Sequence, residues 1–100
     1  MAEYRNEALG ARFTLPDRPS VRQQLAFYSE AGAIVRGPDL YERIWRGALT
    51  LMSDWECSAL PDPHVDPETL TDQRAARVIM WAANVTLGHM NRLEELDPNS

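Results

Sequence analysis

The chain has 100 residues, of which 44% are apolar and 25% are charged, and its formal net charge is −5. This balance is typical of one small globular domain and excludes a wholly disordered chain. Because the negative charge disfavours a phosphate backbone and the longest apolar run, residues 78–83, is too short to cross a bilayer, we expect no nucleic-acid partner and no membrane insertion.

The N-terminal fifteen residues divide into two segments. Residues 1–10 lack the basic start and apolar run of a signal peptide, and we expect a mobile leader there. Residues 11–15 alternate, with Phe13 and Leu15 on one side and polar side chains on the other, as in a half-buried strand. Such a strand pairs with another strand of the chain, a second copy or a client segment; alternatively, it is an unpaired extended arm. Phe13 is expected to be buried in every case.

A first helix is predicted to begin after Ser20. Pro16 and Pro19 interrupt regular structure, and Ser20 followed by Gln23 has the spacing of a capping box. The Gly-Pro-Asp sequence at residues 37–39 is predicted to end this segment and to open the next one.

The first helix carries an apolar stripe that we expect to bind a partner together with the preceding strand. Val21, Leu25 and Tyr28 recur at helical spacing, and Gln24 and Phe27 lie beside them. Strand edges and apolar helix faces are both common docking elements. The expected partner-binding residues are Phe13, Leu15, Val21, Gln24, Leu25, Phe27 and Tyr28.

A second helix is predicted over residues 40–55, because Asp39 and Glu42 repeat the cap spacing. Its broad apolar face contains Tyr41, Ile44, Trp45, Ala48, Leu51 or Met52, and Trp55. Gly47 is unfavourable inside a helix, so we expect it to permit close approach of a neighbouring helix. Residues 60–67 contain three prolines and are predicted to form a Pro-rich loop.

A long third helix is predicted from Thr71-Asp72 to Leu93 or Leu96, followed by a frayed acidic tail over residues 94–100. Its apolar face is too wide for one contact and contains Ala75, Val78, Ile79, Ala82, Ala83, Thr86, Met90 and Leu93, with Trp81 and Val85 at its side. The expected fold is therefore mainly all-α: a single three-helix domain over residues 1–100 with a short N-terminal extended or β arm.

Four large aromatic residues are candidates for either the core or an interface: Tyr41, Trp45, Trp55 and Trp81. Tryptophan is enriched among residues that dominate binding, but a domain with two phenylalanines also needs large side chains to fill its core. The sequence does not decide between a core role and an interface role for them.

No residue pattern indicates a catalytic centre, a metal site or a cofactor. Cys57, His64 and His89 are metal-ligand types, but their spacing is not that of a zinc site. A Cys57 nucleophile would need an orienting group and an oxyanion site, and the sequence contains no signal for either. As the single cysteine, Cys57 excludes an intramolecular disulfide and favours an intracellular site of action.

Several short motifs resemble those of small tail assembly chaperones of long-tailed, siphovirus-like bacteriophages. The resemblance covers about residues 13–96. The motifs are Leu15-Pro16-Asp17, Val21-Arg22-Gln23-Gln24-Leu25-Ala26, Tyr41-Glu42-Arg43 with Trp45, Trp55-Glu56-Cys57, Leu60-Pro61-Asp62 and Ile79-Met80-Trp81-Ala82.

The resemblance implies a mainly helical, non-enzymatic protein of the infected bacterium's cytoplasm. Such a chaperone binds the tape measure protein, helps the tail tube protein polymerise around it and is absent from the finished virion. Self-association also stays open, because a modest core leaves room for an interface to add stability.

Two other functions fit the same composition. A small structural component of the phage tail or neck would use its N-terminal arm to pair between subunits. A small acidic regulator would instead bind a host protein, and the excess of acidic residues in residues 51–100 fits a basic partner surface.

Overall fold

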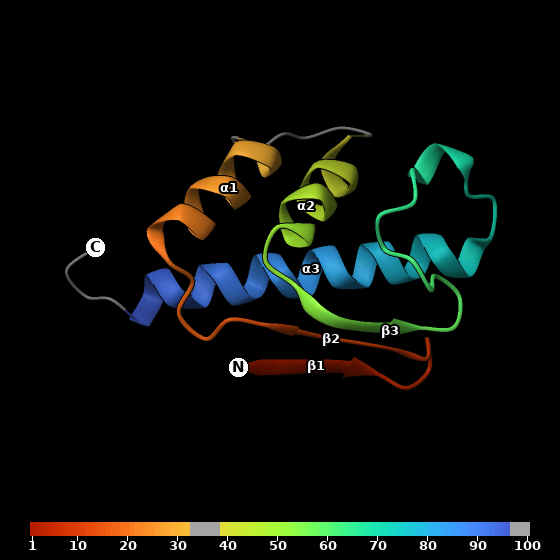
Figure 1. Ribbon diagram of the computed structural model, residues 1–100, viewed down its shortest axis with the longest axis horizontal. Coiled ribbons are helices and arrows are strands. Elements are labelled where there is room, and N and C mark those ends of the chain that lie inside the picture. Colours follow the sequence, from red (N-terminus) through yellow and green to blue (C-terminus); the bar gives the residue numbers. More distant parts are fainter. Residues whose placement is uncertain (33–38, 97–100) are drawn as a thin grey trace.

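A three-stranded antiparallel sheet and three α-helices form the described part of the chain, residues 1–32 and 39–96 of a computed structural model (Figure 1). The elements are β1 (Ala2–Asn6), β2 (Ala11–Leu15), α1 (Val21–Ala31), α2 (Leu40–Leu49), β3 (Ser53–Cys57), the short 3-10 helix η1 (Pro67–Thr69) and α3 (Gln73–Leu96). The domain is therefore α/β, and the prediction of a mainly all-α fold is wrong. Two strands that the sequence pattern did not reveal account for the difference.

The first of these strands replaces the predicted mobile leader. β1 pairs with β2 at every position from Ala2↔Leu15 to Asn6↔Ala11. Gly10 closes the turn between them: its N–H donates to the carbonyl of Glu7 at 3.1 Å, and its φ of +61° suits a residue without a Cβ. β1 is ordered because Tyr4, its one aromatic side chain, packs on the ring of Phe13 across the pair.

The second unexpected strand, β3, replaces the last turns of the predicted helix over residues 40–55. After α2 ends at Leu49, the amides of Leu51 and Met52 both donate to the carbonyl of Ala48, which closes the helix. Trp55 Nε1 then donates to the carbonyl of Leu60 at 2.7 Å. These contacts outweigh the helical spacing of the apolar residues, and the tertiary environment decides the secondary structure.

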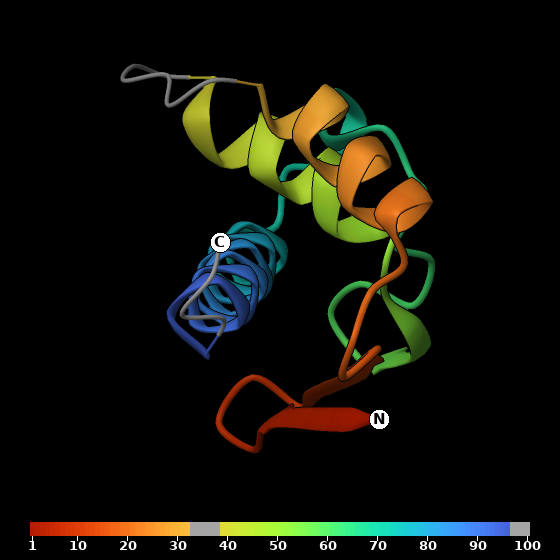
Figure 2. The same ribbon diagram turned by 90° about the vertical axis from the view of Figure 1, so that its left-hand side faces the viewer.

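α3 lies between the other two parts of the fold. Figure 2 shows it end-on, with α1 and α2 on one side and the sheet on the other. Six of the eight residues of its predicted apolar face are buried: Ala75, Val78, Ala82, Ala83, Thr86 and Met90. Ile79 is half-buried, and the side chain of Leu93 lies outside the part that the structure describes. The chain is still helical at residues 94–96, where a frayed tail was expected, and the rest of that tail lies outside the described residues.

The start of α1 follows the predicted capping box. Gln23 N donates to Ser20 Oγ at 3.1 Å, and Ser20 N donates to Gln23 Oε1 at 2.8 Å. The predicted corner is only partly described, because Gly37 and Pro38 lie outside the described residues. Asp39 precedes α2 but makes no side-chain capping hydrogen bond to any described residue. Residues 60–66 form the expected loop, and Pro67 begins η1.

The core is centred on aromatic side chains. Phe13 is fully buried, as expected, and its ring contacts those of Trp55 and Trp81 at centroid distances of 5.9 and 5.2 Å. Trp45 is 1% exposed and packs on Trp55, so it is a core residue. Trp55 and Trp81 are half-buried against the same core.

Gly47 brings α1 and α2 close together, as predicted. It is buried, and a Cβ built there would lie 2.9 Å from both the ring and the backbone oxygen of Phe27. Such a contact is too short for carbon, so only glycine fits at this crossing. The contact also fixes which face of α1 points inward.

Candidate partner-binding site

The seven residues predicted to bind a partner divide into two groups. Phe13, Leu15 and Phe27 are fully buried, so they support the surface without forming part of it. The other four are exposed: Val21 at 70%, Leu25 at 66%, Tyr28 at 40%, and Gln24. The partner-binding candidates that remain all lie on α1.

The exposed residues define one outward face of α1. Phe27 packs against Gly47 on α2, which turns the opposite side of the helix to solvent. Val21, Leu25 and Tyr28 recur at i, i+4 and i+7 and therefore share that side. We call these three residues the α1 stripe.

The stripe leads into an apolar hollow between the three helices. This hollow has a volume of about 410 Å³. Its lining combines Phe27, Tyr28, Ala31 and Gly32 from the α1 end, Leu40, Tyr41 and Ile44 from α2, and Asn84, Leu87 and Asn91 from α3. Tyr28 belongs to both the stripe and the hollow, so the two form one surface, which we call the α1–α2 groove.

Tyr41 extends this surface to the other side of α2. It is 36% exposed and also lines a second hollow of about 300 Å³ next to η1. That hollow contains Leu70, Ile79 and Met80, and Met80 is 42% exposed. Of the four aromatic candidates, Tyr41 is therefore the one placed to contact a partner.

Sequence reasoning missed Met80 as a surface residue. The signal was present in Ile79-Met80-Trp81, because three consecutive apolar residues cannot all face one side of a helix. The second hollow could not be found in this way, since Tyr41 and Glu42 in its wall belong to α2, which is distant from Met80 along the chain.

His89 has a structural role in this arrangement. Its Nε2 donates to the carbonyl of Pro16 at 2.8 Å, which leaves Nδ1 of the neutral ring to accept from the hydroxyl of Tyr4 at 2.7 Å. Arg92 Nη2 donates to the same hydroxyl at 2.7 Å. This network joins β1 and the end of β2 to α3, and it occupies both ring nitrogens of His89.

The other candidate chemical groups are not assembled into a reactive centre. Cys57 is buried at one end of β3, and His64 is exposed in the Pro-rich loop. In residues 1–32 and 39–92, no three side chains of the metal-ligand types His, Cys, Asp and Glu gather in one place. Among the same residues, no helix has the length and hydropathy of a membrane span.

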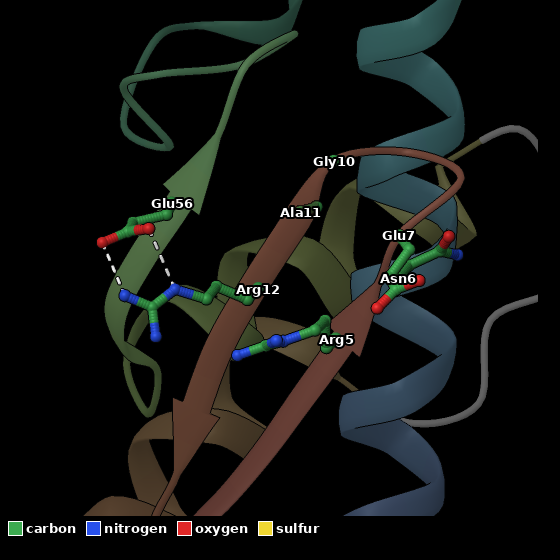
Figure 3. Close-up of a pocket in the computed structure, with 7 residues that line it drawn as sticks. All are labelled: Arg5, Asn6, Glu7, Gly10, Ala11, Arg12 and Glu56. Atoms are coloured by element: carbon green, nitrogen blue, oxygen red, sulfur yellow. Dashed lines mark hydrogen bonds and ion pairs between the residues drawn. The ribbon is translucent and has the colours of Figure 1, made fainter.

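The exposed face of the sheet holds a shallow polar hollow of about 260 Å³ (Figure 3). Arg12 donates to both carboxylate oxygens of Glu56, at 2.9 and 2.6 Å, and Arg5 lies beside this pair. The hydrogen bond from Arg12, followed by its charge, lowers the pKa of the Glu56 carboxyl. Because the two groups neutralise each other, we interpret them as a cross-strand clamp between β2 and β3.

Comparisons with protein-family models, with curated proteins and with solved structures gave no match to this chain.

Proposed function

We propose that this protein is a non-enzymatic phage tail assembly chaperone that binds an amphipathic helical segment of the tape measure protein. The main observation behind this proposal is the α1 stripe, which is exposed and apolar and continues into the apolar hollow between the helices. The motif resemblance supports the choice of client. Action in the host cytoplasm, assistance to the tail tube protein and absence from the finished virion are parts of the same proposal.

The shape and chemistry of the groove suit a helical client. An amphipathic helix binds by laying apolar side chains at i, i+3, i+4 and i+7 into such a groove. Fully burying a Val or Leu side chain contributes about 1.5–3 kcal/mol. Val21 and Leu25 are mostly exposed in the free chain, so covering them is a large part of the free energy of binding.

The surroundings of the stripe have the composition of an interface rim. Arg22, next to Val21 on α1, and Arg43, whose guanidinium lies close to Gly32 of the hollow, are exposed charged residues. A charged rim around an apolar centre is the usual arrangement of protein interfaces. Asn84 and Asn91 in the hollow add amide groups that can hydrogen-bond to polar positions of a client.

The proposal is tested by co-expression with the tape measure protein of the same genome. The wild-type chain should raise the soluble yield of the client and co-purify with it. Leu25→Asp places a charge in the stripe and should abolish capture, because the carboxylate must be desolvated on binding. Ser58→Asp adds the same charge at an exposed position after β3, outside the α1–α2 groove, and should retain capture.

Circular dichroism first establishes that both variants are folded. If folded Leu25→Asp still captures the client as well as Ser58→Asp does, the α1 stripe is not the binding surface. If the wild-type chain leaves the client insoluble and is found at fixed stoichiometry in purified virions, it is a structural component of the tail or neck. A stable complex with a host protein in place of the client would instead identify a regulator.

A further inference from the structure

β1 is an open, regular edge of the sheet. All five of its residues pair with β2 in unbroken register, and no strand among the described residues pairs with its other side. The opposite edge, β3, is bulged, because two of its residues oppose Phe13, and one of these, Asp54, has a φ of +53°. Bulges hinder the addition of a strand, whereas a regular edge is a template for one. β1 is therefore the edge to which a strand can add.

Arg5 has no carboxylate opposite it on a neighbouring strand of the described residues, because its ion pair with Glu3 runs along β1. On the exposed face of the sheet, Arg5 lies directly opposite Arg12, and like charges at opposed positions destabilise a sheet. Arg12 is already bonded to Glu56 on its other side (Figure 3). A carboxylate placed beyond the edge, directly opposite Arg5, would balance the second arginine. The row across the sheet would then be acidic, basic, basic and acidic.

We propose that β1 pairs with β1 of a second copy of this chain, antiparallel and with the twofold axis at Tyr4. In this register, Arg5 lies opposite Glu3 of the partner subunit, and Glu3 lies opposite the partner's Arg5. Each row of the joined sheet then receives the missing carboxylate. Glu3 and Arg5 currently contact each other at 2.8 Å along the strand, with side chains 46% and 57% exposed, so both are available for the exchange.

The charges also select one register. A shift of two residues in either direction would place Glu3 opposite itself or Arg5 opposite itself, and both arrangements oppose like charges. A shift of one residue would turn the partner's apolar face to solvent. The Tyr4-centred pairing therefore joins the two sheets into one, with α3 of both copies on the same face. This surface is separate from the α1–α2 groove.

Light scattering measures the oligomeric state of purified chains from micromolar to millimolar concentration. The wild type should show twice the 11.3 kDa mass of one chain as the concentration rises. Glu3→Arg and Arg5→Glu each oppose like charges in both rows and should remain at the mass of one chain. Glu68→Arg reverses an exposed charge on η1 and serves as the matched control, which should dimerise like the wild type.

Two further samples separate pairing from misfolding. The double variant Glu3→Arg/Arg5→Glu restores opposite charges in both rows and should recover the dimer. An equimolar mixture of the two single variants should form a heterodimer, because every cross-strand pair in it is complementary. A wild type that stays monomeric, or single variants that dimerise as well as the wild type, would overturn the proposal. Failure of both the double variant and the mixture, with folded chains, would do the same.

Discussion

Replacing Gly47 with alanine tests the packing of α1 on α2, which orients the α1 stripe. The new Cβ would lie 2.9 Å from the ring and from the backbone oxygen of Phe27, whereas ordinary contacts begin near 3.4 Å. The ring can rotate, but the backbone oxygen moves only with α1. The helices must therefore separate by about half an ångström, and overpacking of this kind typically costs about 1–3 kcal/mol.

The substitution also has a favourable term, since alanine is preferred over glycine inside a helix by about 1 kcal/mol. The net effect expected for Gly47→Ala is a loss of up to about 2 kcal/mol in the free energy of unfolding. In a domain of this size, each kcal/mol lowers the Tm by roughly 4–8 °C. Thermal unfolding followed by circular dichroism, at one fixed protein concentration, measures the shift.

Gly88 provides the matched control. It lies inside α3, is exposed, and has no atom within 4 Å of a Cβ built on it. Gly88→Ala should therefore show the helix-propensity gain alone and raise the free energy of unfolding by up to about 1 kcal/mol. If Gly47→Ala is as stable as Gly88→Ala, the close crossing of α1 and α2 is refuted, and with it the physical reason for the outward stripe.

Three other substitutions test the core, the polar network and the cross-strand clamp. Trp45→Ala removes a side chain that is 1% exposed and should cost about 3–5 kcal/mol in chemical denaturation. Tyr4→Phe leaves Nδ1 of His89 without its donor and should cost about 1–3 kcal/mol by the same measurement. Because the pKa of Glu56 is lowered in the folded state, its pairing with Arg12 stabilises the fold above the ordinary carboxyl range and is lost as the pH falls through the lowered value. The stability difference between wild type and Glu56→Gln should therefore shrink between pH 7 and pH 3, and a difference that does not change would contradict the clamp.

The elements that the sequence predicted are those whose signals are local. The capping box at Ser20, the alternation around Phe13 and the apolar periodicity of α3 each lie within one segment, and the structure confirms all three. The close helix crossing at Gly47 was also predictable, because glycine is unfavourable inside a helix unless another feature requires it.

The two missed strands depend on distant partners. β1 has one aromatic side chain, Tyr4, and its packing partner Phe13 belongs to the next strand. In β3, Trp55 stands at helical spacing from Ala48 and Leu51, and this spacing hid the two-residue alternation of Trp55 and Cys57. Periodicity alone cannot decide between these patterns in a short segment.

The binding surface was only half predictable for a related reason. Periodicity identified Val21, Leu25 and Tyr28 as one face of a helix, but it could not say whether that face or the one containing Phe27 is buried. The answer depends on the contact between Phe27 and Gly47. Phe27, which was expected to bind a partner, is therefore a core residue.

Hydrogen exchange of the chain alone and in complex with the tape measure protein tests the central claim most directly. Backbone amides exchange more slowly when a partner covers and stabilises their helix or strand, because the element then opens less often. We predict slower exchange in α1 and in the first turns of α2, which form the α1–α2 groove, and unchanged exchange in β1 and β2 at matched chain concentration. Protection confined to β1, with α1 exchanging as in the free chain, would contradict it.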